Sequence, residues 1–183
     1  MAKRDVLKKR IERYLKKEQL LKNQSHTKWE ASFLAKARKN IGVGRLLFAI
    51  SEKEELKKAM GLASHFESFE WVIVMSYYAM YISALAALAR LGFKSESHAA
   101  TIAALEYYYV HEQKHLETKH LNLITKAYIL SKDLVLKLIQ TKIKRETAQY
   151  DATPTISSEN ARAALADAEE FVAKVEEVLG STS

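Results

Sequence analysis

The chain contains no cysteine, one proline and five glycines among its 183 residues. Without cysteine it has no disulfides, thiolate nucleophiles or Cys-type zinc sites, so any metal site would need histidine and carboxylate ligands. Few prolines and glycines disfavour sandwiches and barrels, because those folds need frequent turn residues. The composition therefore predicts an all-α protein, and the length fits one domain with a substantial core.

The N-terminus lacks the apolar run of a signal peptide, since nearly every turn of MAKRDVLKKRIERYLKK carries charge. We expect a cytoplasmic protein. The charge is uneven: residues 1–60 hold 17 Lys and Arg against 7 Asp and Glu, whereas residues 151–183 hold 2 against 7. The basic N-terminal third can attract nucleic acid or an acidic protein, or it can be a lysine-rich face in water.

Residues 1–27 are predicted to form a basic amphipathic helix and a linker, and residues 28–183 a helical bundle. The apolar stripe of the first helix is Leu7, Ile11, Tyr14 and Leu21. A second helix is expected over residues 28–50. The Ser-x-x-Glu pattern at Ser51 predicts that a short helix begins there as a capping box and ends near Gly61. No strand pattern is found.

Residues 71–89, WVIVMSYYAMYISALAALA, form a run of 19 residues without a charge. This length would cross a bilayer. However, its three tyrosines, two serines and many alanines favour a buried central helix, and we expect no membrane span. Gly92 is the expected stop of this helix, and Ser95 or Ser97 the cap of the next.

Two further helices are predicted, over residues 117–150 and from Ser157 or Ser158 to Leu179. Both carry apolar residues at helical spacing. The segment between them contains Pro154, which should end any helix before it.

The stretch from His111 to His115 fits the His-Glu-x-x-His pattern of zinc proteases. That chemistry needs both histidines on one helical face, Glu112 as the general base, and a third ligand. A third histidine at the spacing of one zinc-protease class would be at position 121, which is Leu121. Because no strand edge to hold a substrate is found either, we disfavour a metal at these residues and expect no cofactor.

The stretch SYYAMYISALAALARLGFKSESHAATIAAL, Ser76 to Leu105, resembles the core helix pair of HEPN-domain proteins. The matching pieces are the Tyr-Tyr-Ala-Met-Tyr segment, the Leu-Gly turn and the Ser-His pair at Ser97 and His98. RETAQYD, Arg145 to Asp151, and the helix after it resemble the Arg-x-x-Ala-Asp-Tyr element and closing helix of one prokaryotic branch. Together these pieces cover roughly residues 30–180.

The resemblance implies an antiparallel bundle of four to five core helices with an extra basic N-terminal helix. It also implies a homodimer with a polar motif at a cleft near the dimer axis. Members include metal-independent endoribonucleases, often toxins paired with a small nucleotidyltransferase, and proteins without demonstrated activity. In active members a His follows an Arg after four to six residues and moves a proton, while the Arg stabilises phosphate charge.

This chain departs from that motif, because Tyr150 stands five residues after Arg145 and no histidine follows. A tyrosine with an ordinary pKa near ~10 is a poor base at neutral pH. Arg145, Glu146, Gln149 and Tyr150 still form a candidate phosphate or nucleotide site, which His98 could join. Arg145 could equally pair with a carboxylate and His98 belong to a cap, and Tyr77, Tyr78 and Tyr81 are expected to be packing residues.

We therefore expect a HEPN-like protein that binds RNA or a nucleotide as a homodimer and acts with a nucleotidyltransferase-type partner, in a toxin–antitoxin-related role. Two alternatives stay open. One is a metal-independent endoribonuclease that uses Arg145 and Tyr150. The other is a non-catalytic interaction module whose basic N-terminal helix contacts an acidic partner.

Overall fold

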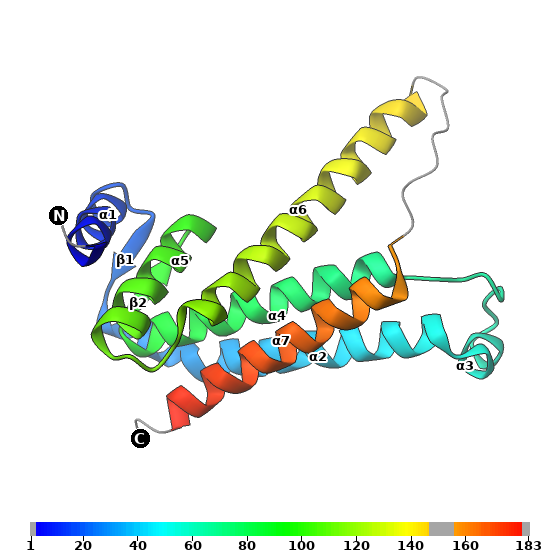
Figure 1. The fold of residues 1–183 in the computed structure, drawn as a ribbon, viewed down its shortest axis with the longest axis horizontal. Coiled ribbons are helices and arrows are strands. Elements are labelled where there is room, and N and C mark those ends of the chain that lie inside the picture. Colours follow the sequence, from blue (N-terminus) through cyan, green and yellow to red (C-terminus); the bar gives the residue numbers. More distant parts are fainter. Residues whose placement is uncertain (1–2, 147–155, 181–183) are drawn as a thin grey trace.

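A computed structural model of the chain describes residues 3–146 and 156–180, with the backbone alone described over residues 133–146. The architecture is a bundle of helices, as predicted (Figure 1). The elements are, in chain order, α1 (Lys3–Lys16), β1 (Leu20–Lys22), η1 (Gln24–Trp29), α2 (Glu30–Glu52), α3 (Glu54–Ala59), α4 (Phe69–Arg90), β2 (Phe93–Ser95), α5 (His98–Leu105), the π-helical η2 (Glu106–Glu112), α6 (Thr118–Glu146) and α7 (Ser158–Gly180).

Helix α4 is the centre of the bundle and contacts α2, α5, α6 and α7. It is long and apolar enough to cross a membrane by length and composition, yet 67% of its most apolar window is buried inside the protein. Its second half is rich in alanine and serine, which lets neighbouring helices approach closely. The burial fits the predicted central core helix.

The interface between α2 and α7 accounts for part of the uneven charge in the sequence. Three arginine–glutamate pairs cross between these two helices: Arg38 to Glu176 at 2.5 Å, Arg45 to Glu169 at 2.6 Å and Arg162 to Glu52 at 3.1 Å. These pairs are partly exposed, so each contributes little to stability. Part of the basic charge of α2 is therefore paired with glutamates of α7 in the same chain.

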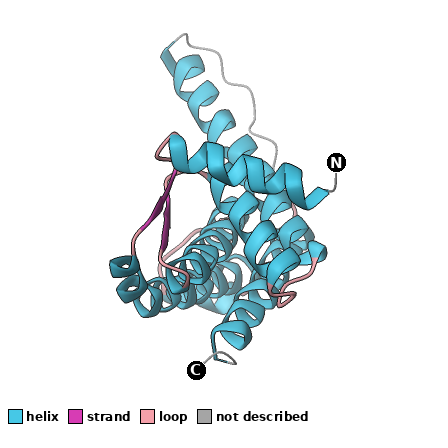
Figure 2. Ribbon diagram, turned by 90° about the vertical axis from the view of Figure 1, so that its left-hand side faces the viewer, coloured by secondary structure: helices cyan, strands magenta, loops and turns pink. Residues whose placement is uncertain are grey.

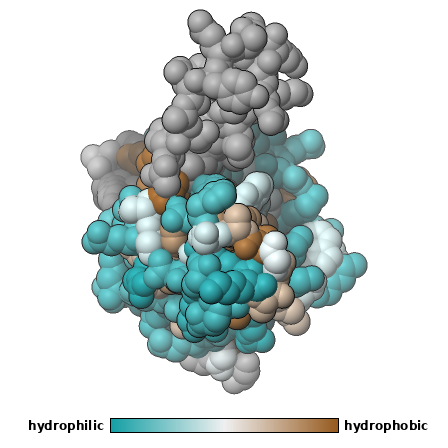
Figure 3. Space-filling view, turned by 90° about the vertical axis from the view of Figure 1, so that its right-hand side faces the viewer, coloured by the Kyte–Doolittle hydropathy of each residue, from teal (hydrophilic) through white to brown (hydrophobic). Residues whose placement is uncertain are grey.

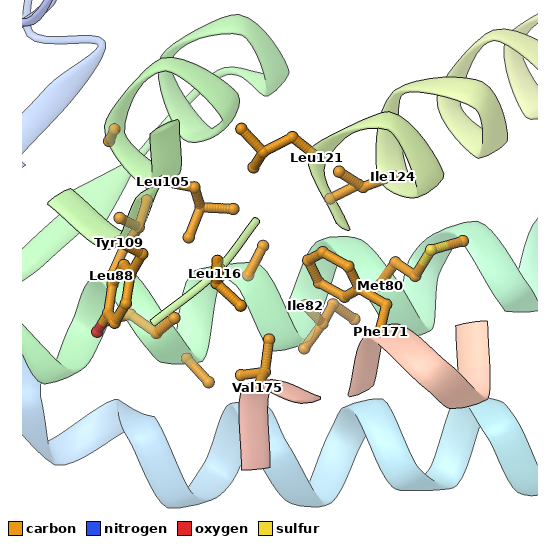
Figure 4. Close-up of a cluster of buried hydrophobic side chains, with 14 of the residues drawn as sticks. Met80, Ile82, Leu88, Leu105, Tyr109, Leu116, Leu121, Ile124, Phe171 and Val175 are labelled. Carbon is orange, nitrogen blue, oxygen red and sulfur yellow. The ribbon is translucent and has the colours of Figure 1, made fainter. Parts of the chain in front are cut away.

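The main hydrophobic cluster joins α4, α5, η2, α6 and α7 (Figure 4). Phe171 of α7 lies beside Met80 of α4, and Phe171, Val175 and Met80 are all fully buried. The Tyr109 hydroxyl, also buried, donates a 2.6 Å hydrogen bond to the Ala87 carbonyl. That carbonyl lies in the last turn of α4, where carbonyls lack a partner within the helix, so Tyr109 completes the helix end.

A two-stranded antiparallel sheet, absent from the sequence prediction, ties the N-terminal segment to the bundle (Figure 2). Leu20 pairs with Ser95 and Lys22 with Phe93. Next to it, the Asn23 amide donates a 2.8 Å hydrogen bond to the Gly92 carbonyl. The strands are three residues each, too short for an alternating pattern to be recognised in the sequence.

Gly92 ends α4 in the left-handed conformation, with φ of +77°, which confirms the predicted stop. A Cβ atom at this position would lie 2.8 Å from Gln24 Oε1 and 3.3 Å from the Asn23 carbonyl oxygen. The glycine therefore serves two purposes: it turns the chain, and it leaves room for η1 to approach.

The first helix is shorter than predicted. It ends at Lys16, and the chain turns at Glu18, whose φ is +55°, before β1 begins. Leu21, expected on the helical stripe, is instead in β1. Leu7, Ile11 and Tyr14 are buried as predicted, and α1 packs on α5 and η2.

The capping-box prediction at Ser51 is wrong. Ser51 lies inside the last turns of α2, and α3 begins at Glu54 without a side-chain cap. The Ser51 hydroxyl donates to the Leu47 carbonyl at 2.9 Å and accepts from the Ser68 amide at 2.9 Å. A tertiary contact with the start of α4 has replaced the local cap, which a four-residue pattern cannot reveal.

Candidate functional site: the aromatic cluster around His98

The structure separates the two parts of the predicted site. His98 is the first residue of α5, where the Ser97 side chain accepts a 3.2 Å hydrogen bond from the Ala100 amide. This confirms the helix start predicted at Ser95 or Ser97. Arg145 and Glu146 are the last two residues of α6, whereas Gln149 and Tyr150 lie outside the described residues.

His98 and Arg145 are not neighbours within one chain. The His98 ring stacks on the Tyr128 ring of α6, with ring centroids 3.8 Å apart and an interplanar angle of 14°. Arg145 follows Tyr128 on the same helix by 17 residues, which corresponds to roughly 25 Å at 1.5 Å per residue. One ligand group can therefore contact both residues only if the Arg145 comes from a second chain.

His98 is instead part of a continuous cluster of aromatic rings, which we call the aromatic cluster. Its members come from three helices: Tyr77, Tyr78 and Tyr81 from α4, His98 from α5, and Tyr128 from α6. Tyr77 is in contact with the four other rings, at centroid distances of 5.2 Å to Tyr78, 5.8 Å to Tyr81, 6.1 Å to His98 and 5.7 Å to Tyr128.

The rings of the aromatic cluster differ in exposure. Tyr78 is 46% exposed, whereas the other four are half-buried. Tyr77 and Tyr81 thus pack as predicted, but Tyr78 presents its ring to solvent. Since every nucleobase has an apolar face that stacks on aromatic rings, the half-exposed Tyr78 ring, which rests on Tyr77, is suited to that contact.

Burial keeps the aromatic cluster uncharged. It lowers the pKa of His98 to about 4 and raises the pKa of Tyr77 above its usual value. Both side chains are therefore neutral at pH 7. The Nδ1 atom of His98 is buried and has no hydrogen-bond partner among the described residues, so the imidazole can still accept or donate one hydrogen bond there.

A cation lies beside the aromatic cluster on α6. Lys132 is one helical turn after Tyr128, on the same face, and is exposed. Sequence reasoning missed both Tyr128 and Lys132. Tyr128 stands alone in an apolar helix pattern, and nothing in the linear sequence indicates that it meets a histidine 30 positions earlier.

The His-Glu-x-x-His segment does not form the helical face that a zinc site needs. The π-helical η2 ends at Glu112, and Lys114 has a φ of +57°. His111 Nε2 lies 3.8 Å from Glu106 Oε1, while Glu112 pairs with Arg4 of α1. Among the described residues, no group of three His, Asp or Glu side chains is placed to hold a metal. Glu112 thus forms an ion pair that links η2 to α1.

The fold is that of an all-α helical bundle, with a cluster of aromatic rings shared by α4, α5 and α6. The HEPN domain family matches the chain over residues 53–178, and the chain belongs to this family. The match spans α3 to α7 and leaves out α1, β1, η1 and α2. It implies a function related to nucleotides or RNA. No curated protein matches the chain.

Proposed function

We propose that this HEPN protein binds RNA, or a nucleotide, at the aromatic cluster, and that it does so as a homodimer. The observation that carries the proposal is the half-exposed Tyr78 ring, supported from behind by Tyr77, with neutral His98 and Tyr128 in the same cluster. Family membership supplies the class of ligand.

Each component matches a part of the ligand. The Tyr78 ring offers a stacking surface, worth about 1–3 kcal/mol per base. Lys132 supplies positive charge for the adjacent phosphate, and the Arg145 of a second copy offers a bidentate contact to another phosphate.

The separation of His98 and Arg145 along one chain supports the proposed dimer, since a second copy could bring its Arg145 near the first copy's aromatic cluster. Trp71 of α4 and Ile129 of α6, 47% and 54% exposed, offer apolar surface for such a contact. By resemblance, the partner protein is a small nucleotidyltransferase, and the role is that of one half of a toxin–antitoxin-like pair.

The stacking role can be tested with two matched substitutions, Tyr78→Phe and Tyr78→Leu. The first keeps the ring and the second removes it. We expect Tyr78→Phe to bind a fluorescent single-stranded RNA like the wild type, and Tyr78→Leu to bind it about 5- to 150-fold more weakly, as a loss of about 1–3 kcal/mol implies. Fluorescence anisotropy measures both. Equal affinity of all three proteins would refute the stacking surface.

The endoribonuclease alternative uses Arg145, which the backbone of α6 places at the helix end. Incubation of the purified protein with RNA in EDTA tests it directly. Cleavage that is lost in Arg145→Ala would make the protein a metal-independent nuclease. If the RNA is not cleaved, or if the variant cleaves it equally, the endoribonuclease alternative is refuted and RNA binding is the only function proposed.

A further inference from the structure

We infer that the protein has a second RNA-contact surface at the opposite end of the fold from the tip of α6. We call it the basic edge: Lys16 and Lys17 at the end of α1, Lys22 in β1, and Lys28 with Trp29 in η1. This inference rests on the proposed RNA binding and names a further place where the RNA backbone lies. The basic edge precedes the residues matched by the HEPN domain.

The chain runs along one edge of the molecule from α1 to α2. After Glu18 it forms β1, which pairs with β2, and it is then held by the hydrogen bond from the Asn23 amide to the Gly92 carbonyl. Figure 2 shows this path: α1 crosses the view, and the strand descends from it toward η1 and α2. The four lysines thus follow one another along a backbone that is fixed at several points.

The lysines of the basic edge keep their charge available. All four are exposed, and none pairs with a carboxylate of the described residues. Lys22 Nζ lies 5.2 Å from the centre of the Phe93 ring, and Lys28 Nζ lies 6.0 Å from that of Trp29. These contacts orient the ammonium groups without neutralising them.

The neighbouring carboxylates are mostly engaged elsewhere. Glu30, the first residue of α2, pairs with Arg90, and Glu96, beside β2, pairs with Lys94. Between Lys16 and Trp29 the sequence contains one carboxylate, that of Glu18. Four lysines against one glutamate leave a local surplus of positive charge, which attracts a polyanion.

An ordered aromatic ring stands within this charge. Trp29 stacks on His26, with ring centroids 4.8 Å apart and an interplanar angle of 14°, and meets Phe33 edge-on at 6.3 Å. Trp29 is half-buried, so part of its ring can receive a base. Positive charge that follows the backbone, with a fixed aromatic ring beside it, is the arrangement of proteins that bind single-stranded nucleic acid.

Among the described residues, this surface has no large exposed apolar side chain that could insert into a membrane or pack on an apolar protein partner. The large apolar side chains that are exposed among the described residues all lie elsewhere: Val6, Leu46, Met60, Trp71, Tyr78 and Ile129. The basic edge therefore offers charge and one aromatic ring without an apolar patch. This composition favours the phosphates and bases of RNA.

The test compares two double variants of equal charge change. Lys22→Gln with Lys28→Gln removes two cations of the basic edge, whereas Lys53→Gln with Lys58→Gln removes two exposed cations next to and within α3. Figure 1 shows α3 at the other end of the molecule, and that end is mostly hydrophilic in Figure 3. Affinity for a fluorescent single-stranded RNA is measured by anisotropy at several salt concentrations.

We expect the dependence of log K on log salt concentration to flatten by about 1.4 in the Lys22/Lys28 variant, because each phosphate contact contributes about 0.7 for single strands. The Lys53/Lys58 variant should keep the wild-type slope. Equal slopes in all three proteins, or equal losses in both variants, would overturn the basic edge while leaving the proposed function intact.

Three outcomes distinguish a failure of the basic edge from a failure of the proposed function. A wild-type protein without affinity for RNA would end both proposals. If Tyr78→Leu weakens RNA binding while the Lys22/Lys28 variant does not, the aromatic cluster alone binds RNA. If wild type binds polyglutamate as tightly as RNA, and the Lys22/Lys28 variant loses both, the basic edge recognises acidic proteins and the inference is wrong. Circular dichroism confirms that each variant is folded.

Discussion

Both halves of α4 are apolar, but they differ in side-chain size and in surroundings. From Ala79 to Arg90 nearly every side chain is buried by α2, α5, η2 and α7. From Phe69 to Tyr78 the helix buries one side and exposes Trp71 and Tyr78 on the other, seven residues apart. One uninterrupted apolar segment therefore provides core packing at one end and a surface for a ligand or partner at the other.

Substituting one large side chain in each half should give the largest contrast. Met80 is fully buried, so Met80→Ala removes its apolar contacts and leaves a cavity, at a cost of about 2–5 kcal/mol. Trp71 is 47% exposed, so Trp71→Ala should cost about 1 kcal/mol or less. Chemical denaturation of both variants measures the free energy of unfolding, and similar losses would show that the two halves are equally buried.

The end of the buried half can be tested at Gly92. Gly92→Ala should lower the free energy of unfolding by about 1–2 kcal/mol for the left-handed conformation alone. The clash with Gln24 should add to this loss. The control is Gly42→Ala in α2, where a Cβ meets nothing within 4 Å, and we expect a gain of about 0.5–1 kcal/mol there. Thermal unfolding of both variants gives the comparison, and a stable Gly92→Ala variant would contradict the account of the turn.

A third test concerns pH and His98, which lies beside the exposed half. Burial lowers the pKa of His98 to about 4 in the folded protein, against about 6.5 in the unfolded chain. Between these values the unfolded state binds the extra proton, so stability falls as the pH falls from about 6.5 to 4. The rings facing His98 belong to Tyr77, Tyr81 and Tyr128.

We therefore expect His98→Gln to lose less stability than the wild type over the same acidic interval. Urea unfolding at pH 7 and at pH 4.5 measures the difference. An equal loss in both proteins would mean that His98 is accessible to protons in the folded state.

The sequence predicted the fold well because the signals are local. Proline and glycine scarcity, apolar spacing, the stop at Gly92 and the cap at Ser97 each depend on residues within a few positions. The failures have a common origin. Ser51 matched the local pattern of a capping box but accepts a hydrogen bond from the Ser68 amide instead. His111 and His115 matched a metal-binding motif that needs one continuous helix, but the helix ends between them at Glu112.

The candidate site was predicted in part. His98 and Arg145 were both identified through the resemblance to HEPN-domain motifs, while Gln149 and Tyr150 lie outside the described residues. Tyr128 and Lys132 were missed, since a ring and a lysine in a long helix carry no local mark of a site. The Tyr78 ring was assigned to packing because its apolar segment is otherwise buried.

By itself the sequence determined an all-helical protein with a central apolar helix and a basic N-terminal part, because helix formation and amphipathic burial depend on periodicity along the chain. Only the tertiary structure shows which rings surround His98 and that three arginine–glutamate pairs join α2 to α7. It also shows that the lysines of the basic edge have no carboxylate partner among the described residues. These contacts join residues far apart in the chain. Which residues meet in such contacts depends on how the helices cross, and the spacing of residues along the chain contains no information about that crossing.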